Sequence, residues 1–564
     1  MAFQRSHRLN LLRLAVLLIV ALVGIKFLFR DSLTLDLHKH VSKDGGFWGK
    51  PGDPKLGAVA PVRSLEVPIA KAAGPRPETR RQPLQDVGVA ELRLVHLDLK
   101  GAAPRVSYLE QVFPFLSKLG ANGVLLEYED MFPFKGELEI LRSPYAYSDE
   151  DIDRIQQLAQ RNNLEVIPLV QTFGHVEFIL KHEKYRPLRE VEHFPNSLNP
   201  HIPDTLSLLQ AVLTQVMDLH RRASWLHIGA DEVFHLGEGQ DSKNWLSRNG
   251  GDVGKLYLSH IREVVRFMAG RYQNLRLLLW DDMLRKVSVA AIQDSGIAEH
   301  ASPMLWFYVP DMDTEQIGTY ISKYAESGFK TIWFASAFKG TTGPAQTWTP
   351  LNHHLQNHLG WLKVIQSMGK FPAIRYQGIA LTGWQRYDHY SVLCELLPVG
   401  IPSLAVCLQT LVNAGFTEAT KKKVLDLLGF QSIQLEKSTC EGSGAFPGSE
   451  VYRMVEHIHG QLRESIVKTL EEESSIKGWF SQYHRKHRFG NPRNLENFGS
   501  KVLKVHEDWE SFLQTFRTHL EGIYFPDTVE EWLEENVNTR MDQLRSFVRD
   551  YKEIVRLNAR PKAL

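Results

Sequence analysis

Two adjacent carboxylates, Asp231 and Glu232, stand in the segment HIGADEV at residues 227–233, directly after the apolar stretch SWLHI. Neighbouring carboxyl groups in one site cannot be equivalent, because each charge raises the pKa of the other. One group can then stay protonated and donate a proton, while the other stays ionised and accepts a hydrogen bond. The pair therefore predicts general acid/base chemistry at this point of the chain.

Motifs for other kinds of catalysis are missing from the sequence. It contains no H-E-x-x-H, no G-x-S-x-G and no phosphate-binding P-loop. Its three cysteines, Cys394, Cys407 and Cys440, lie far apart and lack the C-x-x-C spacing of a zinc site. Carboxylates can also bind metals, and that alternative stays open. We nevertheless expect neither a metal ion nor a cofactor.

The elements that carry this pair alternate between β-rich runs and helical stretches. Helical spacing of apolar residues recurs between the runs, for example at 106–120, 148–163 and 253–271. Eight such units within residues 89–410 predict an α/β fold, a (β/α)8 TIM barrel with a parallel sheet. An open doubly wound sheet is the rival, but no G-x-G-x-x-G follows the first strand. The predicted strands are 91–99, 123–130, 164–173, 224–233, 275–283, 303–309, 329–338 and 376–387.

Side chains at the carboxyl ends of barrel strands line the active site of such a fold. Carboxylates and indole rings together suit acid/base work on a neutral sugar. Core packing is the alternative interpretation for each tryptophan, and a structural role is the alternative for His175. The candidate substrate-binding residues are Asp98, His175, Trp280, Asp282, Trp306, Tyr308, Trp333 and Trp384.

The segment HIGADEV, with LVHLDLKG, EYEDMFPF and GHVEF before it, resembles family 20 of the glycoside hydrolases, the β-N-acetylhexosaminidases. The resemblance covers roughly residues 90–400. It implies that Glu232 is the general acid/base and that Asp231 orients the acetamido group of the substrate. That group then attacks the anomeric carbon, so the substrate supplies the nucleophile and configuration is retained. The implied substrate is a glycan with a terminal N-acetylgalactosamine or N-acetylglucosamine.

The sequence departs from the family at the first strand. Many members carry an arginine there that grips the outer hydroxyl groups of the sugar, whereas this chain has Asp98 and Lys100. The departure leaves the choice between the gluco and galacto sugars open, with a lean towards tolerance of the galacto form.

Two other functions are compatible with the pattern. One is a non-catalytic glycan-binding membrane protein built on the same barrel. The other is a hydrolase that uses two adjacent aspartates, Asp281 and Asp282.

Outside the barrel, three further regions are predicted. Residues 1–30 hold the run LLRLAVLLIVALVGIKFLF at 11–29, preceded by basic residues, which predicts a signal anchor; a cleaved signal peptide is the alternative. Residues 31–88 have the composition of a stem, and 411–564 predict a C-terminal helical region. We expect a single-pass type II membrane protein of the Golgi or secretory pathway, attached to the membrane through its N-terminal helix.

The near balance of acidic and basic residues helps to predict which partners the protein binds. Lys and Arg number 66 and Asp and Glu 65, which gives a formal net charge of +1. A nucleic-acid-binding protein would be basic overall or along a stripe, so we expect no nucleic-acid partner. A homodimer stays open.

Overall fold

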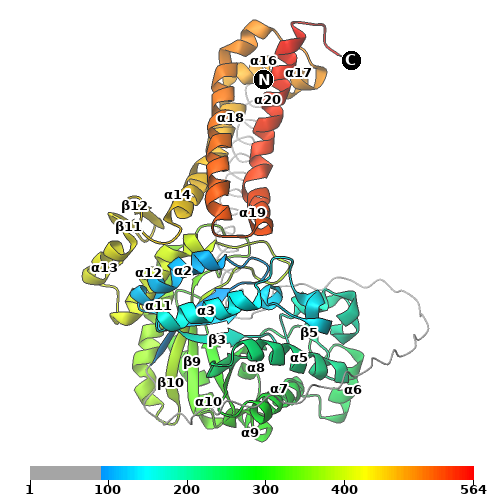
Figure 1. The fold of residues 1–564 in the computed structure, drawn as a ribbon, viewed down its shortest axis with the longest axis vertical. Helices are drawn as coiled ribbons and strands as arrows, with labels where there is room; N and C mark the ends of the chain where they lie inside the picture. Colours follow the sequence, from blue (N-terminus) through cyan, green and yellow to red (C-terminus); the bar gives the residue numbers. More distant parts are fainter. Residues whose placement is uncertain (1–90, 564) are drawn as a thin grey trace, which may run out of the picture. The chain divides into compact units, whose positions relative to one another are not determined.

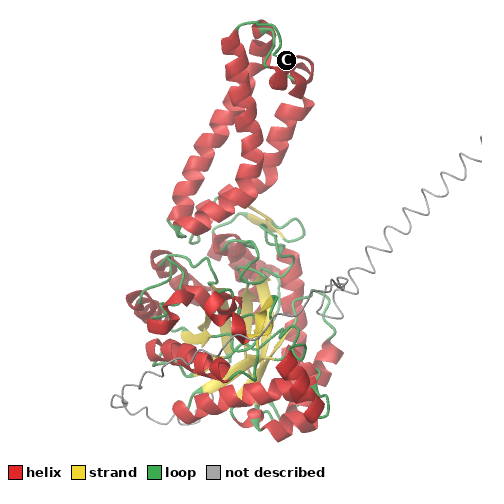
Figure 2. Ribbon diagram, turned by 90° about the vertical axis from the view of Figure 1, so that its right-hand side faces the viewer, coloured by secondary structure: helices red, strands yellow, loops and turns green. Residues whose placement is uncertain are grey.

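The computed structural model describes residues 91–563. Eight parallel strands close into a barrel in the order β1, β10, β9, β8, β7, β6, β3, β2. Figure 2 shows these strands at the centre of a layer of helices. The predicted (β/α)8 barrel is thus confirmed. Its strands are β1 (Leu92–Asp98), β2 (Gly123–Glu127), β3 (Glu165–Leu169), β6 (Trp225–His227), β7 (Arg276–Trp280), β8 (Ala301–Trp306), β9 (Thr331–Lys339) and β10 (Arg375–Gly383).

Capping residues mark the start of α3 and the end of α2. Ser148 starts α3 with a capping box, because its hydroxyl accepts from the Asp151 amide and the Asp151 side chain accepts in return. Gly120 ends α2 with a left-handed φ of 101°. The helices around the barrel are α2 (Val106–Leu119), α3 (Asp149–Arg161), α5 (Pro203–Leu219), α7 (Val253–Arg271), α9 (Val289–Ser295), α10 (Thr314–Glu326), α11 (Leu351–Ser367) and α12 (Leu397–Val412).

Short elements decorate the loops of the barrel. They include an antiparallel hairpin and several single-turn helices. Their bounds are β4 (Arg189–Val191), β5 (Phe194–Leu198), η1 (Glu129–Met131), α4 (Glu177–Leu180), α6 (Gln240–Arg248) and α8 (Asp282–Arg285).

Apolar side chains fill the interior of the barrel. Leu94, Leu125, Ile167 and Leu278 meet there with almost no exposure, together with Trp333. A barrel packed in this way is a solid core, so chemistry is confined to the strand ends.

The third and fourth strands are shorter than predicted, and both end just before the candidate site. β6 ends at His227 because Gly229 and Ala230 adopt left-handed φ angles of 63° and 69°. Only one residue pair, Leu169 and His227, joins β3 to β6. The segments that follow these two strands are therefore free to present side chains at the mouth.

Helices dominate the chain after the barrel. Figure 1 shows the long helices α18 and α20 side by side, in orange and red. The backbone N–H of Arg105, before α2, donates to the Ile523 carbonyl at 2.7 Å and so ties the barrel to the α18–α19 connection. The elements are α13 (Glu418–Leu428), β11 (Ser432–Gln434), β12 (Thr439–Glu441), α14 (Ser449–His457), α15 (Arg463–Val467), α16 (Ser474–Trp479), α17 (Gln482–His487), α18 (Pro492–Glu521), α19 (Pro526–Leu533) and α20 (Thr539–Leu557).

Within residues 91–563, no helix has both the length and the apolar composition needed to span a membrane. The predicted signal anchor at residues 1–30 and the predicted stem at 31–88 lie outside the described residues.

Candidate active site

The backbone that carries the carboxylate pair has an unusual conformation. Ala230 and Glu232 have φ angles of 69° and 41°, each of which costs on the order of 1 kcal/mol or more for a non-glycine residue. Neighbouring side chains hold this conformation. Gln171 Oε1 accepts from the Ala230 amide at 3.0 Å, and the Tyr257 hydroxyl donates to the Ala230 carbonyl at 2.9 Å. The pair is therefore set in place by Gln171, in the loop after β3, and by Tyr257 of α7.

Asp231 is fixed by a side-chain hydrogen bond. Gln171 Nε2 donates to Asp231 Oδ1 at 3.0 Å, so one glutamine side chain holds both the backbone and the carboxylate of this turn. Burial raises the pKa of Asp231 to about 6. The charge of Glu232 adds to that rise, and His175 opposes it. Asp231 can thus be ionised at neutral pH while its second oxygen is left for a ligand.

Glu232 has different neighbours from those of Asp231. Its Oε2 lies 3.1 Å from His175 Nε2, and its side chain is 21% exposed against 11% for Asp231. Its backbone N–H donates to Asp282 Oδ2 at 2.9 Å. The two adjacent acids therefore differ in exposure and in partners, as a division of roles requires.

His175 joins the two acids. Its Nε2 also lies 3.7 Å from Asp231 Oδ2, and its Nδ1 lies 4.0 Å from Glu177 Oε1. Burial alone would lower the pKa of His175, but the charges of Asp231, Glu232 and Glu177 outweigh it and raise that pKa well above the usual value. A positively charged ring at this point attracts both carboxyl groups, and its contact with Glu232 is a charge-assisted hydrogen bond.

Gly174 allows the loop after β3 to approach the pair. A Cβ atom on Gly174 would lie 2.2 Å from the Asp231 carbonyl oxygen, well inside van der Waals contact. Only glycine fits at this position without moving the turn.

Asp282 supports the site from the first residue of α8, just after β7. Its Oδ1 accepts from Trp306 Nε1 at 3.3 Å, while its Oδ2 accepts from the Glu232 amide. Burial, helped by the charge of Asp231, raises the pKa of Asp282 to about 7. The carboxylate of Asp281 is hydrogen-bonded to other residues, because Arg285 and Tyr324 donate to it at 2.7–2.8 Å. Two adjacent aspartates free to act together are therefore not found here.

The aromatic candidates divide into two groups. Trp306 stacks on Tyr308 with ring centroids 5.1 Å apart. Burial raises the pKa of the Tyr308 phenol well above its usual value. The ring centroids of Trp280 and Trp384 lie 5.9 Å apart.

Trp333 lies elsewhere. Its indole meets Trp225 at 5.1 Å, edge to face, near the first residues of their strands. The structure does not bring Trp333 together with the other candidates.

Asp98 lies at the exit of β1 within a buried polar group. Its carboxylate accepts from Lys100 Nζ at 2.9 Å and from the Gln385 amide at 2.8 Å. The Lys100 ammonium lies 5.1 Å from the centroid of the Trp384 ring. Asp98 is therefore linked to the pocket through the residues that border Trp384.

Three important residues escaped the sequence-based selection. Gln171 donates to Asp231, Glu177 lies 4.0 Å from His175, and Tyr257 donates to the Ala230 carbonyl before the pair. Gln171 could have been selected from the sequence, because it is a polar residue near the end of the third predicted strand. Tyr257 lies in a helix whose apolar spacing indicates only core packing.

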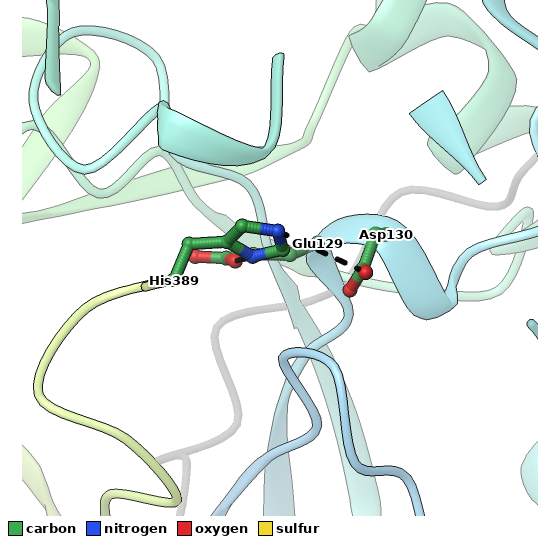
Figure 3. A group of neighbouring side chains, drawn as sticks. All are labelled: Glu129, Asp130 and His389. Atoms are coloured by element: carbon green, nitrogen blue, oxygen red, sulfur yellow. Dashed lines mark hydrogen bonds and ion pairs between the residues drawn. The ribbon is translucent and has the colours of Figure 1, made fainter. Parts of the chain in front are cut away.

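In the described part of the chain, one group of side chains has the spacing of a metal site: Glu129, Asp130 and His389 (Figure 3). His389 enters from the loop after β10, and the two acids come from η1. Its Nδ1 lies 2.9 Å from Glu129 Oε2, and its Nε2 lies 2.8 Å from Lys181 Nζ. Both ring nitrogens are thus occupied, and Lys181 already supplies a positive charge. The group fits an ion-pair network better than a metal centre.

Comparisons with known proteins identify the family of the chain. Residues 111–338 match the family model described as "Glycosyl hydrolase family 20, catalytic domain". Hexosaminidase D of Homo sapiens is 48% identical over 464 residues, which cover 82% of this chain and 95% of the human protein. Hexosaminidase D of Bos taurus is 53% identical over 343 residues, which cover 61% of this chain and 98% of the bovine protein.

These matches define the chain as a glycoside hydrolase on a (β/α)8 barrel. The chain belongs to glycosyl hydrolase family 20, as the segment HIGADEV predicts, and within it is similar to hexosaminidase D. Among solved structures, a family 20 exo-β-N-acetylglucosaminidase from Vibrio harveyi, in complex with N-acetylglucosamine, is 17% identical. That alignment covers 60% of this chain and 58% of the other, with a TM-score of 0.42.

Proposed function

We propose that the protein removes terminal β-linked N-acetylhexosamine residues from glycans by substrate-assisted, retaining hydrolysis. The observation that carries the proposal is the unequal environment of the two adjacent acids. Asp231 is tied to Gln171 and is the more buried, whereas Glu232 contacts His175 and is the more exposed.

In the first step, the ionised carboxylate of Asp231 accepts a hydrogen bond from the acetamido N–H. This contact turns the acetamido carbonyl oxygen towards the anomeric carbon, which it attacks as the bond to the leaving oxygen breaks. Glu232 donates its proton to that oxygen. The products of this step are the free leaving group and an oxazolinium ion.

Tyr308 follows β8 at the carboxyl ends of the strands, and burial keeps its hydroxyl protonated, so we infer that it donates to the acetamido oxygen. The indoles of Trp280, Trp306 and Trp384 offer an apolar surface to the acetamido methyl group. In the second step, Glu232 accepts a proton from water, which opens the oxazolinium ion and returns the sugar with its original configuration.

The decisive experiment is hydrolysis of aryl β-N-acetylhexosaminides, gluco and galacto, by the purified protein and its Glu232→Gln variant. The substitution removes the proton donor and keeps the shape of the side chain. We expect kcat to fall by about 10²–10⁴-fold. An inactive wild type that still binds N-acetylhexosaminides would instead favour the non-catalytic glycan-binding function.

For specificity, we propose that both epimers are accepted. Asp98 and Lys100 stand where many family members have an arginine. Because they pair with each other, no guanidinium group is present there to bind the outer hydroxyl groups of the sugar. Comparable kcat/KM values for the gluco and galacto substrates are expected. A ratio beyond about 10²-fold would refute this part of the proposal.

For location, we propose that residues 11–29 anchor the protein as a type II membrane protein of the secretory pathway. The support is the apolar run and the basic residues before it. Membrane fractions washed with alkaline carbonate should retain the full chain and release a chain lacking residues 1–30. Full release of both would contradict the proposal.

A further inference from the structure

A cavity of about 170 Å³ lies between the barrel and the C-terminal helices. Its border is formed by the loop that leaves β9, by α14 and α15, and by α19 and α20 with the turns beside them. This volume corresponds to about five water molecules, so a small ion fits with part of its hydration shell. The polar residues that border the cavity are Thr347, His459, Arg463, Trp532, Asn536 and Arg540.

Two arginines border this cavity without an acidic partner. Arg463 begins α15, and Arg540 lies in the first turn of α20. Neither side chain forms an ion pair or a hydrogen bond within the described residues, whereas Arg545 of α20 pairs with Glu510. None of the described residues that border the cavity is acidic. The fold therefore brings two positive charges together without a counter-charge from these residues.

Neutral hydrogen-bond donors accompany the two arginines. The His459 ring stacks on Trp348 with ring centroids 5.9 Å apart, and Trp348 is itself fixed, because its Nε1 donates to the Ser438 carbonyl at 3.0 Å. The Trp532 side chain is buried, yet its Nε1 has no acceptor within the described residues. Buried N–H groups in folded proteins nearly always have an acceptor, and the cavity that Trp532 borders is where one can enter.

Two π-helical turns bring these groups to the cavity. One is η6 (Ile458–Leu462), which carries His459, and the other is η8 (Glu534–Asn538), which carries Asn536. Each turn comes just before one of the two arginines. Turns of this kind are rare and are frequent at functional sites. Because a π-helical turn rotates the side chains that follow it about the helix axis, the two turns determine which groups meet at the cavity.

The cavity lies at the end of the barrel that carries the carboxylate pair. Thr347 belongs to the loop that leaves the carboxyl end of β9. Glu531, the neighbour of Trp532 in α19, accepts from both terminal nitrogens of the Arg386 guanidinium, in the loop after β10. A ligand in the cavity would therefore connect a loop of the barrel mouth to α15 and α20.

We propose that this cavity binds a tetrahedral oxyanion, a phosphate or sulfate group, through Arg463 and Arg540. Guanidinium groups suit such a ligand, because their planar forks of N–H donors match the spacing of its oxygens. The anion neutralises the two charges, and His459 and Thr347 border the same space as further donors. The proposal is independent of the glycosidase activity, because neither Asp231 nor Glu232 borders the cavity.

The test is isothermal titration calorimetry of the purified protein with sodium sulfate and with sodium phosphate, at neutral pH and at an ionic strength held constant with sodium chloride. We expect saturable binding by the wild type. Kd should rise about tenfold in Arg463→Gln and in Arg540→Gln, because each variant loses one charged donor. The double variant should bind neither ion. In thermal melts, sulfate should raise the Tm of the wild type and leave that of the double variant unchanged.

The matched control is Arg556→Gln on the same helix, α20. Arg556 is exposed, forms no ion pair within the described residues, and lies about 24 Å along the helix from Arg540. Its removal changes the net charge equally and should leave Kd unchanged, which separates a site from general attraction of anions to a basic surface. If an arginine variant fails to fold, Thr347→Glu replaces it, because a carboxylate at the border of the cavity competes with the ion and should raise Kd.

Glucose 6-phosphate distinguishes the two sources of the group. Binding at least as tight as that of inorganic phosphate would show that the site accepts an ester carried on a larger molecule, whereas binding of the inorganic ions alone would show that the ligand is the free ion. Either result supports the oxyanion site. A wild type that shows no saturation with sulfate or phosphate below about 10 mM, or an equal loss of affinity in Arg556→Gln and Arg540→Gln, would overturn it.

Discussion

His175 Nε2 lies 3.1 Å from Glu232 Oε2, and the imidazole is held in its charged form by the carboxylates around it. The positive charge of His175 lowers the pKa of Asp231 against the effect of burial, and the contact with Nε2 fixes the position of the Glu232 carboxyl group. The backbone of His175 is itself in the left-handed region, with φ at 49°, so the ring is placed by a strained turn.

Replacement of His175 by Gln should therefore change both rate and pH dependence. We expect kcat to fall by about 10²-fold, and the acid limb of the kcat/KM profile to move to higher pH, because Asp231 loses the charge that lowers its pKa. Steady-state kinetics from pH 4 to 8 measure both. His300→Gln, on the exposed connection before β8, is the matched control. A reduced rate with an unmoved limb would show that His175 only shapes the pocket.

The ionisation of Asp231 should set the acid limb of the wild type. The carboxylate accepts the acetamido N–H only when ionised, and its pKa is raised to about 6 by burial. We expect the acid limb of kcat/KM to reach its plateau by about pH 7 and to fall as the pH drops through about 6. In Asp231→Asn the limb should disappear and the rate should fall about 10²-fold. A wild-type limb near 4 would contradict this assignment.

The barrel and the identity of the acid pair are predictable from the sequence, and the arrangement around the pair is not. Alternating periodicity specifies strands and helices, and HIGADEV at a strand exit marks Asp231 and Glu232. The selection of Trp333 illustrates the limit. The residue does lie in a barrel strand, but near the start of β9 and not at its carboxyl end. The sequence pattern does not show which end of a strand a residue lies near. Likewise, the link from Glu531 to Arg386 spans 145 residues and leaves no local pattern.

Asp282 provides a test between the proposed mechanism and one based on adjacent aspartates. Its carboxylate holds the Glu232 amide and Trp306, whereas Asp281 is neutralised by Arg285. Asp282→Asn keeps one acceptor, so we expect a loss of about tenfold in kcat, much smaller than in Asp231→Asn. Aryl glycoside kinetics on both variants decide the matter. Abolished activity in Asp282→Asn with Asp231→Asn still active would favour the aspartate pair.

The same Asp231→Asn substitution should stabilise the fold at neutral pH. The native state raises the pKa of this carboxyl from 3.8 to about 6, so it binds the proton more tightly than the unfolded state does. The free energy of unfolding therefore falls as the pH rises from about 4 to about 6, by at most about 3 kcal/mol. Asparagine does not ionise. Thermal melts should give the variant a higher Tm than the wild type at pH 7, with the gap closing towards pH 4. A lower Tm at pH 7 would show that the ionised carboxylate is stabilised by His175 more than burial penalises it.

The approach of Gly174 to the acid pair yields a test that leaves every functional group in place. In Gly174→Ala the new methyl group would lie 2.2 Å from the Asp231 carbonyl oxygen and 3.1 Å from the carbonyl of Glu232, so the turn must move. A displacement of about 1 Å at the reacting groups costs about 10²-fold in kcat. The matched control is Gly270→Ala in α7, where an added Cβ meets nothing within 4 Å and the helix gains stability. Kinetics and melts on both variants should show a slow enzyme in the first case and an unchanged one in the second. Wild-type kcat in Gly174→Ala would mean that the turn yields without moving Asp231 and Glu232, and that the close approach of the two loops is not needed for catalysis.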